Sequence, residues 1–222
     1  MRPTIRDFVA LIADAFPIQE PIYEFGAFQV AGQEDLANLR PLFPGLHFVG
    51  ADMREGPGVD TLLNLHDIDR PSESVGTVLC LDTLEHVEYP HRAIEEVYRI
   101  LKPGGVAVIS SVMDFPIHDY PFDYWRFTPE AFRSILQPFE LSFVGFAGTE
   151  SFPHTVVGLG FKKVRPELEQ FMSRYAKWQA QQVPSTGGSA VARMLKLLSP
   201  PILHLLLSKL YSTTHRLLTR SK

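Results

Sequence analysis

The sequence predicts an α/β fold with a mostly parallel sheet, helices on both faces and an antiparallel pair at its end. Short runs rich in Val, Ile and Leu alternate with helical-period segments, as in parallel sheets that are covered on both faces. After residue 137, two further apolar runs flank a short loop, which indicates a hairpin. The 222 residues, 45% of them hydrophobic and 21% charged, have the composition of an ordinary globular protein.

Each element follows from its local pattern. Apolar residues at helical spacing and Thr4 as N-cap predict a helix over 4–16, and Pro129 behind Thr128 marks a second helix start. The expected helices are 4–16, 91–101 and 129–136, with a short link at 34–42. The expected strands are 21–25, 47–51, 61–65, 77–81, 106–110, 140–146 and 154–161.

The chain is expected to divide into a domain over residues 1–165 and a basic helical extension over 166–222, with a linker near 183–189. Residues 170–222 contain eight basic residues and no acidic residue, whereas the preceding body is strongly acidic. The extension therefore suits an anionic membrane surface, the acidic body itself or a homodimer contact, and these alternatives stay open. Nucleic acid is not expected as a partner, because the body is acidic.

The single cysteine, Cys80, excludes an intrachain disulfide and a multi-cysteine zinc site, and it favours a reducing compartment. The expected location is cytoplasmic, with membrane association through the basic extension as an addition. The first 16 residues lack the apolar run of a secretory signal, and no segment has the roughly 20 apolar residues that span a bilayer.

Polar residues or glycine follow four of the expected strands. They are Glu24 with Gly26, then Asp52, Asp67 and Asp82. Ligands of parallel sheets bind outside the carboxyl ends of the strands, and a carboxylate there can accept both hydroxyls of a ribose. A single aspartate in such a place is often only a helix cap, but four such strand-end positions in order favour a ligand site.

The run from Leu81 to Pro90, followed by residues 93–105 with their Arg-Ile-Leu-Lys-Pro-Gly-Gly ending, resembles the class I S-adenosylmethionine-dependent methyltransferases. It is most similar to the small-molecule branch that includes quinone-biosynthesis methyltransferases. The resemblance covers about residues 19–162. It implies a Rossmann-like, seven-stranded sheet with an antiparallel final strand, and S-adenosylmethionine as cofactor.

The resemblance also implies roles for individual residues. Those near the methionine end are Glu24, Gly26, Leu81 and Asp82, and those near the ribose and adenine are Asp52, Met53, Asp67 and Ile68. One departure is serious. The family's Gly-x-Gly-x-Gly loop keeps only Gly26 here, so Phe28 and Gln29 stand where the backbone normally approaches the cofactor. A cofactor site of this kind requires that Asp52 faces the crevice at the carboxyl ends of the strands and that Phe28 does not fill it.

Catalytic and substrate residues are expected at the reactive end of the cofactor. The candidates are His86 and His118 as catalytic groups, and Tyr120, Tyr124, Trp125 and Arg126 as acceptor contacts from the aromatic segment 113–127. Each has a structural alternative, such as a helix-start histidine or an internal ion pair of Arg126. No metal is expected, although His118, Asp119 and Asp123 resemble a ligand trio.

The sequence thus predicts an S-adenosylmethionine-dependent methyltransferase that acts on a small or lipid-linked acceptor, at oxygen. Two alternatives remain: a methyltransferase-like scaffold without cofactor, which the altered glycine loop favours, and a peripheral membrane protein whose basic extension is its main functional part.

Overall fold

A computed structural model describes residues 2–118, 122–164, 166 and 168–183 of the chain. The strands are β1 (Ile22–Phe25), β2 (Phe48–Asp52), β3 (Thr61–Leu62), β4 (Val75–Leu81), β5 (Leu101–Val112), β6 (Leu141–Thr149) and β7 (Phe152–Phe161). The helices are α1 (Pro3–Ala15), α2 (Glu34–Ala37), α3 (Pro90–Ile100), α4 (Pro129–Ile135) and α5 (Glu169–Gln182), with 3-10 turns η1 (Arg40–Leu42) and η2 (Leu84–His86).

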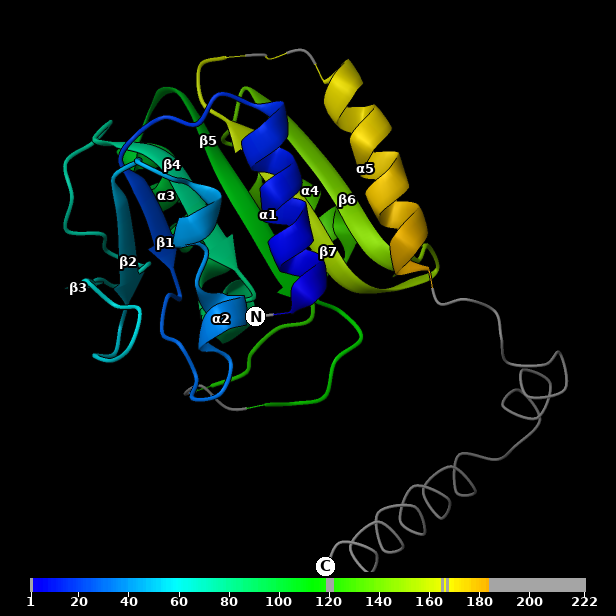
Figure 1. Cartoon of the computed structure of the whole chain (residues 1–222), viewed down its shortest axis with the longest axis horizontal. Helices are drawn as coiled ribbons and strands as arrows, with labels where there is room; N and C mark the ends of the chain where they lie inside the picture. The colour runs from blue at the N-terminus through cyan, green and yellow to red at the C-terminus, as the bar shows by residue number, and fades with distance from the viewer. Residues whose placement is uncertain (1, 119–121, 165, 167, 184–222) are drawn as a thin grey trace, which may run out of the picture. The chain divides into compact units, whose positions relative to one another are not determined.

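The seven strands form one sheet in the order β3-β2-β1-β4-β5-β7-β6 (Figure 1). Strands β1 to β5 pair in parallel, and β7 runs antiparallel between β5 and β6. The strand order reverses between β1 and β4, and ligands of open α/β sheets bind at such a switch point. The predicted fold class, a Rossmann-like sheet with an antiparallel final strand, is confirmed.

Helices cover both faces of the sheet. The helices α1 and α5 pack together on one face, and α3 and α4 pack on the other (Figure 1). Each covering helix buries one apolar stripe, as the amphipathic pattern predicts. In α1 the buried residues are Ile5, Phe8, Val9 and Ile12, and in α5 they are Phe171, Tyr175 and Trp178.

Helix α1 begins at Pro3, so its N-cap is Arg2 and not the expected Thr4. Three elements differ more from expectation. Strand β3 has only two residues, because only Ala51 and Asp52 of β2 pair with it. Strand β5 begins at Leu101, which pairs with Val75 of β4 instead of ending the preceding helix. The link at 34–42 consists of α2 and the separate turn η1, where Pro41 stands near the start of the second piece.

The chain divides into two compact units, Met1–Pro184 and Ser185–Lys222. Helix α5 belongs to the first unit, because it packs on α1 and β6, so the expected boundary at residue 165 precedes a helix of the body. The expected linker near 183–189 and the helices beyond it lie outside the described residues, apart from Val183. Among the described helices, none is long and apolar enough to cross a membrane.

Candidate active site

A cavity of about 550 Å³ opens at the carboxyl ends of β1, β2 and β4. Phe25 pairs with Ala51 on one side and with Cys80 on the other. The residues that follow these three therefore lie side by side at the same edge of the sheet. The register therefore brings residues from distant parts of the sequence to one place. The volume lies within the range of small-molecule and cofactor sites.

Six of the eight residues that the resemblance assigns to the cofactor line this cavity. They are Glu24, Gly26, Asp52, Met53, Leu81 and Asp82. The other two do not: Asp67 is exposed, and Ile68 is buried in the core, where its N–H donates to Glu96 Oε2 at 2.9 Å. The wall near β3 is formed instead by residues 63–66, one turn earlier in the chain.

Gly26 lies where no other residue fits. Its φ is +83°, a region that L-residues rarely adopt, and a Cβ added there would lie 2.2 Å from Thr83 Oγ1. Thr83 is held in place by its own hydroxyl, which lies 2.9 Å from the Leu81 carbonyl. The first glycine of the loop is thus required by the close approach of the segment after β4.

The side chain of Phe28 lines the cavity without filling it. Its ring lies against Gly56, where an added Cβ would come 2.3 Å from Phe28 Cε2, and the Arg54 guanidinium lies 4.4 Å from its centroid. The N–H of Gln29 donates to the Pro57 carbonyl at 2.8 Å. The missing loop glycines are therefore accommodated by a neighbouring loop that has a glycine where the ring needs space.

Asp52 lies in the cavity wall with 7% of its surface exposed. Its Oδ1 accepts hydrogen bonds from the Arg54 backbone N–H at 3.0 Å and from Arg54 Nε at 3.2 Å. Its Oδ2 accepts from the Phe28 N–H at 3.3 Å. These contacts fix the direction of the carboxyl group, whose oxygens can accept hydrogen bonds from a diol.

Glu24 is buried at the base of the cavity, with 6% of its surface exposed. Burial raises the pKa of its carboxyl to about 8, and the positive charge of Arg40 opposes the rise. The group is therefore largely protonated at neutral pH. A cation placed beside it would favour the ionised form.

Asp82 carries a cationic partner from the first residues of the chain. Arg2 Nε lies 3.1 Å from Asp82 Oδ2 and Arg2 NH2 lies 2.8 Å from Oδ1, while Ser110 Oγ donates to Oδ1 at 2.9 Å. Arg2 also contacts the Thr155 hydroxyl and lies 5.8 Å from the centroid of Phe115. Arg2 lines the cavity, and no local sequence signal indicated it.

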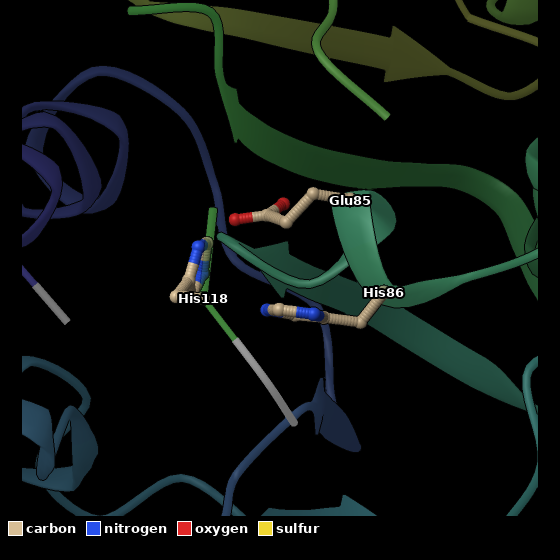
Figure 2. Close-up of side chains that lie close together, drawn as sticks. All are labelled: Glu85, His86 and His118. Carbon is tan, nitrogen blue, oxygen red and sulfur yellow. The ribbon is translucent and has the colours of Figure 1, made fainter. Parts of the chain in front are cut away.

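Glu85, His86 and His118 also line the cavity, and their side chains lie close together (Figure 2). The two imidazoles lie 4.7 Å apart between centroids, in an edge-to-face arrangement. Burial lowers the pKa of His86, so its ring is neutral at pH 7. Burial also raises the pKa of Glu85, and the charge of Asp82 adds to that effect. Both predicted catalytic histidines thus face the cavity, with a carboxyl group that the sequence did not single out.

Of the four predicted acceptor contacts, Tyr120 lies outside the described residues, and the other three do not line the cavity. Tyr124 is partly exposed, and the indole of Trp125 donates to the Val87 carbonyl at 3.0 Å. Arg126 directs its five N–H groups to Phe115 O, Pro116 O, Trp125 O and both carboxylate oxygens of Asp123. Because every donor is engaged, Arg126 organises the loop and has none left for an acceptor.

Comparison with known proteins identifies the class of site. Residues 48–109 match the family described as methyltransferase domain. This match, which runs from β2 to β5, supports a class I S-adenosylmethionine-dependent methyltransferase. No curated protein matches it in sequence.

Solved structures share the fold of this methyltransferase domain at low identity. A methyltransferase from Thermotoga maritima is 19% identical, with a TM-score of 0.54 over 72% of this chain and 89% of its own. One from Archaeoglobus fulgidus is 14% identical, with a TM-score of 0.52 over 71% and 94%. A third, from Haloferax volcanii in complex with the activator Trm112, is 15% identical, with a TM-score of 0.53 over 75% and 92%.

The residues of the methyltransferase cavity fit S-adenosylmethionine chemically. Its sulfonium and ammonium groups are cationic, and Glu24 and Asp82 are carboxyl groups in the wall. Its ribose offers two hydroxyl donors, for which the carboxyl oxygens of Asp52 are acceptors. The apolar side chains of Leu63, Leu65 and Met53 suit an adenine ring.

Proposed function

We propose that the protein transfers a methyl group from S-adenosylmethionine to a hydroxyl oxygen of an apolar small molecule or lipid-linked acceptor. The observation that carries the proposal is the convergence of Glu24, Asp52 and Asp82 beside Gly26 in one cavity. In this assignment Asp52 holds the ribose, and Glu24 and Asp82 face the methionine portion. The wall from Leu63 to His66, in place of Asp67 and Ile68, meets the adenine.

When bound, the cofactor supplies a methyl group already activated by its sulfonium, which leaves as a neutral thioether. The protein has to hold an acceptor oxygen in line with that methyl, exclude water and remove the oxygen's proton. His86 and His118 stand at the end of the cavity where these tasks fall. This placement supports oxygen as the acceptor atom, because a hydroxyl must lose a proton whereas a neutral amine need not do so first.

The surface beside this end supports an apolar acceptor. The segment that follows β5 exposes large apolar side chains, namely Phe115 (41%), Ile117 (87%), Phe122 (59%), Tyr124 (42%) and Trp125 (44%). Phe115 lines the cavity itself, so the exposed group continues from its wall. A group of exposed apolar side chains commonly marks a binding surface. A lipid-linked acceptor would place its chain here and its hydroxyl inside.

Isothermal titration with S-adenosylhomocysteine tests the cofactor assignment. We expect one binding event per chain in the wild type and at least a tenfold loss of affinity, about 1.4 kcal/mol, in Asp52→Ala. The matched control is Glu130→Gln, because that side chain is 81% exposed and does not line the cavity. A wild type that binds no S-adenosylhomocysteine would exclude the enzyme and leave the scaffold alternative.

A further inference from the structure

We propose that Glu85, His86 and His118 bind one divalent transition-metal ion of the zinc type at the acceptor end of the cavity. The three side chains come from η2 and from the loop after β5, and each offers one ligand atom within 4.8 Å of the others. The side chains point toward a common space in Figure 2. Ligand atoms around one zinc ion lie about 3 Å apart, so small side-chain rotations complete the site.

In both imidazoles, Nδ1 lies beside acceptor oxygens. His86 Nδ1 lies 2.6 Å from the Phe122 carbonyl, and His118 Nδ1 lies 3.1 Å from the Pro116 carbonyl and 3.2 Å from Asp123 Oδ2. An acceptor oxygen beside Nδ1 keeps the proton there and leaves the lone pair on Nε2. Histidine ligands of metals are oriented in this way by carbonyl or carboxylate partners.

The carboxyl group of Glu85 supplies an independent sign of a missing ligand. The residue is completely buried, and Ser111 Oγ donates to its Oε2 at 2.7 Å. Its Oε1 is buried and has no hydrogen-bond partner among the described residues. A buried acceptor without a partner is rare in native proteins, and a bound cation would satisfy it.

The loop that carries His118 is held in a fixed shape around the cluster. Asp123 Oδ2 accepts the His118 backbone N–H at 2.8 Å, and the Asp123 side chain is only 2% exposed. Arg126 binds both oxygens of that carboxylate at 2.5 and 2.7 Å. Asp123 therefore orients the ligand His118 and is not itself a ligand. This differs from the trio of His118, Asp119 and Asp123 that the loop spacing resembles.

The ligand set selects the class of ion. Two imidazole nitrogens with one carboxylate suit zinc, cobalt, iron or manganese better than magnesium or calcium, which prefer all-oxygen sites. Three protein ligands leave at least one position open, as in catalytic sites. A hydroxyl bound there would lose its proton more easily. This role in methyl transfer rests on the proposed function, but the binding of the ion does not.

Cobalt(II) absorption and zinc calorimetry on the full chain, stripped with a chelator, test the site. We expect one saturable ion per chain, with visible cobalt bands that are more intense than those of hydrated cobalt because the bound ion has fewer ligands. His118→Ala should weaken binding at least tenfold, and Glu85→Gln should do the same while keeping the volume and the Ser111 contact. His91→Ala is the matched control, because this histidine is exposed on α3 and should leave affinity unchanged.

The outcomes separate this proposal from the previous one. Circular dichroism first confirms that each variant is folded. We expect His118→Ala to fold, because His118 lies on a loop. No stoichiometric ion in the wild type, or equal affinity in His118→Ala and His91→Ala, would overturn the metal site. Titration of the same samples with S-adenosylhomocysteine reports the cofactor site alone. Ion binding without cofactor binding would refute only the proposed function, and the reverse would refute only the metal.

Discussion

The guanidinium of Arg2 lies against the carboxylate of Asp82, with contacts of 3.1 and 2.8 Å, inside the cofactor cavity. The two residues are separated by the whole of α1, β1, β2, β3 and β4. The side chains are 23% and 16% exposed, so the ion pair is only partly screened by solvent. A residue at the start of the chain thus neutralises one of the carboxylates that face the methionine end of the site.

Replacing Arg2 with alanine should change the preference between charged and neutral cofactor. S-adenosylmethionine carries a sulfonium charge that its demethylated product lacks, and the Arg2 charge repels it. We expect Arg2→Ala to bind S-adenosylmethionine about fivefold more tightly, about 1 kcal/mol, with little change for S-adenosylhomocysteine. Calorimetry with both ligands measures the ratio. Weaker binding of both would show instead that Arg2 holds a cofactor anion, and Arg133→Ala serves as a surface control.

Two glycines with the same backbone conformation allow a matched test of the loop. Gly26 and Gly32 have φ of +83° and +82°, but only an added Cβ at Gly26 meets a neighbour, Thr83. Gly32→Ala should cost about 1–2 kcal/mol of unfolding free energy through its backbone alone. Gly26→Ala should cost clearly more and abolish S-adenosylhomocysteine binding. Urea denaturation and calorimetry check both; equal costs would contradict the packing argument.

The strands and the functional residues at their ends were predictable, because the apolar runs are clear and each ends in a polar residue or glycine. Glu24, Asp52 and Asp82 therefore appeared in the sequence as strand-end positions, and the register of β1, β2 and β4 brings them together. The ending of β3 was less predictable. Its pairing with β2 stops after two residues, which moves the cavity wall from Asp67 back to residues 63–66.

The partners of individual side chains could not be predicted from the sequence. Arg2 pairs with Asp82 across 80 positions, and nothing local distinguishes it from any N-terminal arginine. For Arg126 the sequence left two alternatives, an acceptor contact and an internal ion pair, and its donors are all satisfied by its own loop. Glu85 sat in the recognised run after β4, yet only its buried, unpartnered oxygen marks it.

The raised pKa of Glu24 makes stability depend on pH. The unfolded carboxyl releases its proton near pH 4.5, whereas the folded one keeps it up to about pH 8. The unfolded state therefore binds fewer protons in this window, so this group lowers the unfolding free energy as pH rises from 4.5 to 8, with no further change above. Glu24→Gln should remove this contribution.

Urea unfolding at pH 5.5 and pH 7.5 measures the effect as a difference between Glu24→Gln and wild type, in which most other titrating groups cancel. Between pH 5.5 and pH 7.5, we expect the unfolding free energy of the variant to rise by at least about 1 kcal/mol relative to that of the wild type. The limit for one group is about 1.4 kcal/mol per pH unit. A constant difference across the window would show that Glu24 ionises normally in the folded protein.

The Arg126–Asp123 pair should matter for both the loop and the acceptor end. Lysine keeps the charge of Arg126 but loses the planar fork that reaches Asp123 and three backbone carbonyls together. We expect Arg126→Lys to lower the unfolding free energy by about 2 kcal/mol and to weaken zinc binding, because His118 loses its fixed position. S-adenosylhomocysteine affinity should stay within a few-fold, since the cofactor residues lie on the strand ends.

Arg133→Lys, in an exposed pair with Glu130, should change stability by less than about 0.5 kcal/mol. If the two arginine variants behave alike in urea and zinc titrations, the loop does not depend on Arg126, and the orienting role of Asp123 fails with it.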